Sequence, residues 1–252
     1  MTLRDHLQLA TEPGAKRVRG YCRGRKIVDS IRPLLVFEIP NYPAFYFARE
    51  DVDMVALVRT DNVQTSSPIL GAADVFSLVV DDVAAAESAW SYTHSPLPAI
   101  DGLMRFAWDA MDSWFEEDEE VFVHPRSPYV RVDALSSSRH VQIKLDGVLV
   151  AETHRPTLLF ETDLPVRYYV PKTDVRMELL RATDSSSQCP YKGTARYWSV
   201  DTGTSVHDDV AWSYPTPHAE SGKIAGMLAF YDDRFDVFVD GVSSHRSRPR
   251  VS

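Results

Sequence analysis

The segment Cys189-Pro190-Tyr191-Lys192-Gly193 holds the residues of this sequence that most suggest chemistry. Pro and Gly favour a tight turn, which would bring the Lys192 ammonium near the Cys189 sulfur and favour its thiolate. This predicts a nucleophilic or redox role for Cys189, and Lys192 beside turn amides suits a phosphate or carboxylate. The alternative is a small, buried and inert Cys189 beside a Lys192 that is a surface charge or clamps a loop carbonyl.

Aromatic residues are dense around and after this segment: Tyr191, Tyr197, Trp198, Trp212, Tyr214 and Tyr231. Alternation along a strand places Trp212 and Tyr214 on one face. With Tyr191 and Tyr197, this pair is the candidate wall of a site for a small planar or cationic ligand. The alternative is that these rings are ordinary packing residues of a β core.

The remaining chemical motifs are weaker. His207-Asp208-Asp209 has the composition of a general base or a metal ligand, but as a turn after Gly203 it is typical of a solvated surface segment. Cys22 and Cys189 form no C-x-x-C pair, and no Walker loop, G-x-G-x-x-G, H-E-x-x-H or G-x-S-x-G motif occurs. We therefore predict no bound metal and no other cofactor.

An internal repeat organises the chain that must position these residues. Ala-Trp-Ser-Tyr begins at Ala89 and again at Ala211, an offset of 211 − 89 = 122. The stretch 24–38 aligns with 147–161 at offset 123, with shared Gly, Arg-Pro, Leu and Phe-Glu residues. In the first copy, Ser67 and Leu70 stand where the second copy has its Cys and Lys.

Copies of about 110 residues are the right size for independent domains. We expect a polar N-terminal extension at 1–18, a divergent first domain at 19–134, a Ser-rich linker at 135–139 and a second domain at 140–252. The first copy carries about eight extra residues, whose acidic run 116–120 is typical of a solvated loop.

Two charged residues recur in both copies. Arg155 and Glu161 reappear as Arg32 and Glu38, in the copy that lost the Cys and Lys. Because this Arg and this Glu are kept in a copy that lacks the Cys and Lys, we expect them to form a structural ion pair or to lock a turn.

Alternating hydrophobicity predicts a mostly β, antiparallel chain. Asp146-Gly147 predicts a hairpin between 142–145 and 148–150, and further strands are expected at 157–161, 166–170, 196–200, 227–231 and 235–239. Helical turns are expected only at 174–180 and in the Ala-rich segment 82–90.

Composition limits the partners. The formal charge of −9 argues against nucleic acid or an anionic membrane as the main partner. The longest apolar run, 225–231, is far too short to span a bilayer, and the first 20 residues have no apolar signal core, so we expect a cytoplasmic protein. The expected partner is a small-molecule ligand or substrate, and the oligomeric state is left open.

The second copy resembles the domain-of-unknown-function family 427. The resemblance rests on Ala151-Glu152-Thr153, Tyr168-Tyr169-Val170-Pro171, Glu178-Leu179-Leu180-Arg181, the run 189–197 (CPYKGTARY), the run 211–217 (AWSYPTP) and the run 224–231 (IAGMLAFY). The first copy resembles a divergent member, so together the copies imply a tandem protein of two β-tent-like domains, each a bent antiparallel sheet with few short helices. The family is sometimes labelled nucleotidyltransferase-like, but no Gly-Ser followed by Asp-x-Asp supports that activity here.

These observations leave two principal hypotheses. In the first, the second copy is an enzyme that uses Cys189 as nucleophile or redox thiol, Lys192 as anion contact and the aromatic wall for its substrate. In the second, the same site binds a small planar or anionic ligand without chemistry. A structural or interaction role through the acidic loop is the third possibility.

Overall fold

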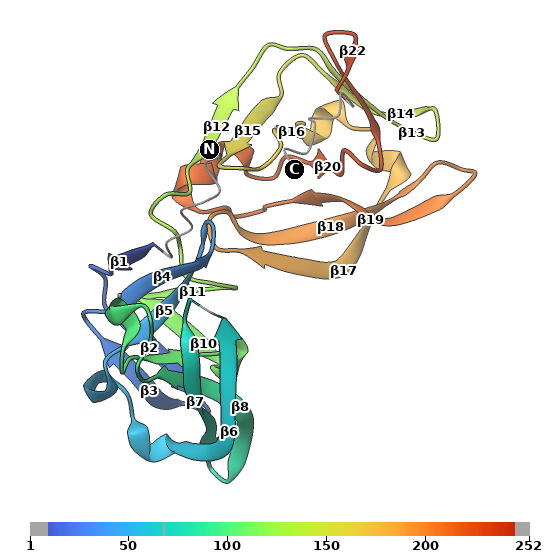
Figure 1. Cartoon of the computed structure of the whole chain (residues 1–252). Helices are drawn as coiled ribbons and strands as arrows, with labels where there is room; N and C mark the ends of the chain where they lie inside the picture. The colour runs from blue at the N-terminus through green and yellow to red at the C-terminus, as the bar shows by residue number, and fades with distance from the viewer. Residues whose placement is uncertain (1–9, 68, 245–252) are drawn as a thin grey trace. The chain divides into compact units, whose positions relative to one another are not determined.

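The computed structural model describes residues 10–67 and 69–244. It divides into two compact units, Met1–Ser127 and Pro128–Ser252, whose elements are labelled in Figure 1. Both units are mostly β, with every strand pairing antiparallel, as the sequence predicts. Each unit is described separately below.

The first unit contains two sheets. The seven-stranded sheet has the order β1-β4-β5-β9-β8-β7-β6 and the four-stranded sheet the order β11-β10-β2-β3. The strands are β1 (Thr11–Pro13), β2 (Val18–Cys22), β3 (Arg25–Ser30), β4 (Leu34–Ile39), β5 (Tyr42–Phe47), β6 (Leu57–Ser67), β7 (Gly71–Val80), β8 (Val83–Tyr92), β9 (Met104–Phe106), β10 (Ser113–Glu116) and β11 (Glu119–Val121).

The second unit repeats this arrangement in three sheets, with the orders β12-β15-β16, β14-β13-β21-β22 and β17-β18-β19-β20. Its strands are β12 (Val132–Ser136), β13 (Val141–Leu145), β14 (Val148–Thr153), β15 (Thr157–Glu161), β16 (Arg167–Tyr169), β17 (Leu180–Cys189), β18 (Gly193–Asp201), β19 (Val206–Ser213), β20 (Ala229–Phe230), β21 (Asp236–Val239) and β22 (Val242–Ser243).

The internal repeat is confirmed by topology. β12-β15-β16 and β17-β18-β19-β20 follow the orders of β1-β4-β5 and β6-β7-β8-β9. In the first unit β5 pairs with β9 and joins the two halves, whereas in the second unit the corresponding link is a single bridge between Val170 and Leu228. The predicted hairpin forms as β13 and β14, because Asp146 and Gly147 both adopt the positive φ that such a turn requires.

The helical content is limited to short 3₁₀ turns: η1 (Arg49–Asp51), η2 (Met54–Ala56), η3 (Pro98–Ile100), η4 (Trp108–Ala110), η5 (Lys172–Asp174), η6 (Met177–Leu179) and η7 (Ala219–Ile224). Two of them overlap the turn expected at 174–180. The helical turns expected at 82–90 are wrong, because this Ala-rich segment is the strand β8 between β7 and β9. Ala has only a weak intrinsic preference, and pairing on both edges overrides it. Within the described residues, no helix combines the length and apolar character needed to cross a membrane.

The observed boundary differs from the expected linker. The two units separate between Ser127 and Pro128, whereas Leu135 and Ser136 lie in β12 and pair with β15. Residues 11–13 likewise belong to the first sheet as β1 rather than to a separate extension. Residues 1–9, Pro68 and residues 245–252 lie outside the described part of the chain. A Ser-rich composition did not exclude sheet pairing, because strand β12 is an edge strand whose exposed side chains tolerate polar residues.

The acidic run of the first copy is not simply a solvated loop. Glu116 is buried and forms an ion pair with Lys16 at 2.5 Å, and the hairpin of β10 and β11 places Trp114 in the core at 3% exposure. Asp118 pairs with Arg19 at 2.6 Å. The expectation of eight extra residues around 111–120 is wrong, because β10 pairs with β2, and β11 with β10, in the same registers as β21 with β13 and β22 with β21, all at an offset of 123. The acidic run therefore belongs to a hairpin that both units share.

The recurring Arg and Glu do not pair with each other. Arg155 forms a two-pronged contact with Asp174, in which Nε lies 3.1 Å and Nη2 2.8 Å from the two carboxylate oxygens. The hydroxyl of Thr153 donates to the same carboxylate at 2.7 Å. Arg155 thus fixes the turn between β14 and β15 against η5, which agrees with a turn lock, while Glu161 has a different partner.

Replacing Arg155 by Met should raise the pKa of Asp174. The hydrogen bonds from Arg155, then that from Thr153, hold the pKa of this carboxyl far below its ordinary value. Charged Asp174 therefore stabilises the fold above the unfolded-state pKa of about 3.9, and this stabilisation is lost as the pH falls further. A ¹³C NMR titration of the Asp174 carboxyl measures the shift.

Arg155→Met should also lower the free energy of unfolding at pH 7. The difference from wild type, measured by urea unfolding at a series of pH values, should narrow as the pH falls below about 4. Exposed Arg32, the counterpart in the first unit, provides the control substitution Arg32→Met. An Asp174 pKa that does not change in Arg155→Met would contradict the assignment.

Candidate functional site

A cavity of about 190 Å³ lies in the second unit between residues of two sheets. One wall comes from β15 and β16 and the other from β18 and β19, with Lys192 from the turn before β18 and Tyr231 after β20. The lining residues are Leu159, Glu161, Leu164, Pro165, Arg167, Tyr169, Lys192, Tyr197, Trp212, Tyr214 and Tyr231. Five of them are aromatic, and three of these, Tyr197, Trp212 and Tyr214, belong to the site that the sequence predicts.

Lys192 is held in place by the turn that the sequence predicts. Its amide donates to the carbonyl of Cys189 at 3.3 Å, and its own carbonyl accepts from the amide of His218 at 3.2 Å. Gly193 follows with φ of 96°, a conformation that favours glycine. The turn therefore sets the direction in which the Lys192 side chain enters the cavity.

The ammonium of Lys192 forms an ion pair with Glu161, the last residue of β15. Both side chains are nearly buried, with 10% and 9% of their surfaces exposed. A buried charge needs a partner, because removal from water is costly. The partner of the Lys192 ammonium is thus a carboxylate that is 31 residues away in sequence, whereas the effect of Lys192 on the Cys189 thiol stays a prediction.

Cys189 and Tyr191 lie outside the lining of this cavity, although Tyr197, Trp212 and Tyr214 are part of it. Cys189 is half-buried at the end of β17, where it packs against the cluster that contains Leu159, Tyr169 and Trp212. This packing agrees with the alternative of a small apolar side chain. A catalytic role for Cys189 stays a prediction.

Trp212 lies at the centre of the aromatic wall. Its indole N–H donates to the hydroxyl of Tyr169 at 3.2 Å, and its ring centre lies 4.6 Å from that of Tyr231. The guanidinium of Arg167 lies 5.7 Å from the ring of Trp212 and pairs with Asp232 at 3.0 Å. Trp212 is opposite Tyr197 in the ladder of β18 and β19, so the two rings share one face.

Three tyrosine hydroxyls of the cavity, those of Tyr169, Tyr214 and Tyr231, stay protonated at neutral pH. Burial raises the pKa of Tyr169 and of Tyr214, and burial together with a hydrogen bond to Tyr197 raises the pKa of Tyr231 to about 12. These three phenols can donate hydrogen bonds, but none is poised to act as a base near pH 7. Tyr197 shares a hydrogen bond of 2.7 Å with Ser187.

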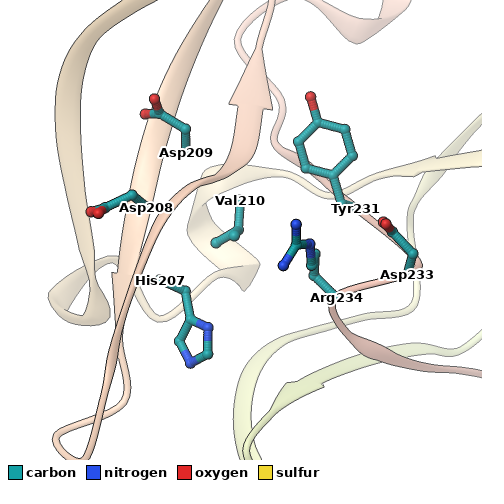
Figure 2. Close-up of a pocket in the computed structure, with 7 residues that line it drawn as sticks. All are labelled: His207, Asp208, Asp209, Val210, Tyr231, Asp233 and Arg234. Atoms are coloured by element: carbon teal, nitrogen blue, oxygen red, sulfur yellow. The ribbon is translucent and has the colours of Figure 1, made fainter.

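A second cavity, of about 380 Å³, contains the His207-Asp208-Asp209 segment (Figure 2). His207 Nε2 lies 2.7 Å from a carboxylate oxygen of Asp146, and Asp209 accepts hydrogen bonds from the hydroxyls of Thr183 and Ser185 at 2.6 Å. The carboxylates of Asp208 and Asp209 point away from the centre of the cavity. Among the described residues, no group of His, Cys, Asp and Glu is arranged to hold a metal ion.

The sequence reasoning missed Glu161, Arg167 and Tyr169 as parts of the site. Glu161 was interpreted as scaffolding because it recurs in the first copy. A difference between the two copies could have identified Arg167, because the first copy has Ala44 at the corresponding position, at an offset of 123. This difference gives the second copy a positive charge that the first copy lacks at that position.

The comparisons with known proteins agree with the repeat. Two regions of the chain, residues 10–117 and 133–241, each match the family described as a domain of unknown function, DUF427. A search of the curated proteins finds no match.

Proposed function

The chain belongs to the DUF427 family, of which it carries two copies, and from this premise we propose that the second copy binds a small planar carboxylate without catalysis. The observation that carries the proposal is the cavity in which five aromatic rings meet Lys192 and Arg167. Aromatic walls accept a planar ligand, and the two cations supply donors for an acidic group.

The size of the cavity limits the ligand. About 190 Å³ is slightly more than the roughly 150 Å³ of a protein cavity that holds benzene. It is smaller than the roughly 300 Å³ at which sites for drug-sized ligands begin. A single aromatic ring with a small substituent therefore fits better than a nucleotide, which disfavours the nucleotidyltransferase-like alternative.

The charges of the lining favour an anion. Lys192 pairs with Glu161 and Arg167 pairs with Asp232, and of these two carboxylates only Glu161 lines the cavity. An ammonium has three donors and a guanidinium five, so one ion pair each leaves donors for a ligand. Carboxylates and phosphates both accept charge-assisted hydrogen bonds from such donors, and the small volume of the cavity favours the carboxylate.

Replacing Trp212 by Leu should weaken the binding of benzoate, the simplest probe of this chemistry, by at least about tenfold. The substitution removes the central ring of the wall and its hydrogen bond to Tyr169. Arg167→Met should have a similar effect, because a lost charge-assisted hydrogen bond of about 1.5 to 3 kcal/mol corresponds to roughly 10- to 150-fold in affinity. Ligand-observed NMR titration gives the dissociation constants.

The control is Trp90→Leu, the same substitution at the counterpart in the first unit, which should leave benzoate affinity unchanged. Circular dichroism confirms that each variant is folded. Unchanged benzoate affinity in both Trp212→Leu and Arg167→Met would refute the proposed site.

Cys189→Ser separates this proposal from the enzyme hypothesis. Because Cys189 lies outside the cavity lining, the variant should bind benzoate with wild-type affinity. A reaction that uses the thiol would instead require Cys189 to be alkylated rapidly by iodoacetamide in the native protein, measured against a Cys22→Ser background.

A further inference from the structure

The first unit contains a cavity of its own, also of about 190 Å³. It lies beside Glu38, the counterpart of Glu161. Six of its twelve lining residues carry aromatic rings: Tyr42, Phe45, Phe106, Trp108, Trp114 and His124. The rings of Trp108 and Trp114 stack with their centres 5.2 Å apart, and the ring centres of Tyr42 and His124 lie 4.8 Å apart.

This cavity is not a remnant of the one in the second unit. Trp114 stands at the position of Val237, because it is opposite Gly20 as Val237 is opposite Ile143, and Trp108 aligns with Asp232 at offset 124. The linings of the two cavities correspond at only three positions: Glu38 with Glu161, and Tyr42 and Ala44 of β5 with Pro165 and Arg167. The first copy therefore built a different aromatic wall against the same carboxylate.

Arg105 lies beside Trp90 in the first unit. It is opposite Trp90 in the ladder of β8 and β9, where the second unit pairs Trp212 with Ala229. Its guanidinium lies 5.0 Å from the ring of Trp90, and its Nε lies 2.7 Å from Oε1 of Glu38. Arg105 thus contacts both Trp90 and Glu38. In the second unit two side chains make the corresponding contacts: Arg167 lies over Trp212, and Lys192 pairs with Glu161.

Glu38 offers an acceptor to a ligand. The hydroxyl of Tyr46 donates to Oε1 at 2.9 Å, and Arg105 pairs with the same oxygen. Glu38 lines the cavity and both of these contacts are made by Oε1, so Oε2 is the oxygen toward which we expect a further donor to be directed. The ion pair with Arg105 balances the charge of Glu38, so the lining favours a neutral ligand rather than an ion.

We propose that the first unit is a second, independent binding site, for a neutral planar aromatic molecule with an N–H donor, of which indole is the simplest example. The ring would lie among Trp108, Trp114 and Phe45, and its N–H would donate to Oε2 of Glu38. Tyr42, half of whose surface is exposed, stands at the rim. This inference does not depend on the function proposed for the second unit.

Ligand-observed NMR on the full chain tests the proposal with indole and with benzofuran, which has the same shape but no N–H. Indole should bind, and benzofuran should bind at least about tenfold more weakly, because a hydrogen bond to a charged acceptor is lost. Excess benzoate should not displace indole.

Two variants of different kinds locate the site. Trp108→Ala removes part of the wall but keeps the backbone carbonyl to which Trp114 donates, and Ala44→Phe fills the cavity without removing a core contact. Both should reduce indole affinity at least about tenfold, whereas Val55→Ala, at an exposed position of the same unit, should not. The proposal is overturned if indole does not bind, if neither Trp108→Ala nor Ala44→Phe weakens it, or if benzofuran binds equally well.

Discussion

Replacing Lys192 by Leu should lower the free energy of unfolding of the second unit by about 3 to 5 kcal/mol, the usual cost of removing one partner of a buried ion pair. The substitution leaves the carboxylate of Glu161, 9% exposed, without its cation. Leu is the residue at the corresponding position of the first unit, Leu70, so the change tests charge rather than size. Urea unfolding followed by circular dichroism and fluorescence measures the loss.

The first unit tolerates Leu70 because Arg105 supplies the cation that Glu38 needs. In the second unit Ala229 occupies the position of Arg105 and supplies none. The double variant Lys192→Leu with Glu161→Gln should therefore recover much of the lost stability, because the uncompensated charge is gone.

The control is Arg176→Met, which breaks the exposed pair of Arg176 and Glu178 and should change stability little. A loss in Lys192→Leu no larger than in this control would show that the pair of Lys192 and Glu161 is not buried in solution.

Replacing Trp114 by Ala should destabilise the first unit by about 3 to 5 kcal/mol, the range for removal of a large aromatic side chain from a core. Trp114 is 3% exposed and packs on Phe45, Phe47 and Trp108. The counterpart in the second unit is the smaller buried residue Val237, which lies at the same position of the repeated strand. Urea unfolding monitored by circular dichroism measures it.

A second substitution, at Gly20, tests whether the Trp114 ring packs as described. Gly20 is opposite Trp114 in the ladder of β2 and β10, and a Cβ added at Gly20 would lie 2.8 Å from the indole ring. Gly20→Val should thus destabilise the wild-type protein by overpacking, about 1 to 3 kcal/mol, and destabilise the Trp114→Ala variant much less, because its side chain then occupies the space left by the ring. Additive effects would contradict the packing described.

Local signals in the sequence predicted the strands well. Asp146-Gly147 specified the hairpin of β13 and β14, and the run after Pro156 specified β15 at its observed bounds. These predictions were confirmed because turn residues and alternation act over a few neighbouring positions. The segment 82–90 failed for the converse reason, since its strand conformation depends on partners in β7 and β9 rather than on its own residues.

The sequence by itself determined the tandem repeat, the mostly β architecture, the turn that carries Lys192 and the pairing of Trp212 with Tyr214 on one face. Only the tertiary structure decided which charges meet: Lys192 with Glu161, and Arg105 with Glu38 in the other copy. It also decided where cavities open. Partner choice among buried charges depends on contacts between distant strands and on the need to compensate each buried carboxylate, and neither is encoded in the spacing of neighbouring residues.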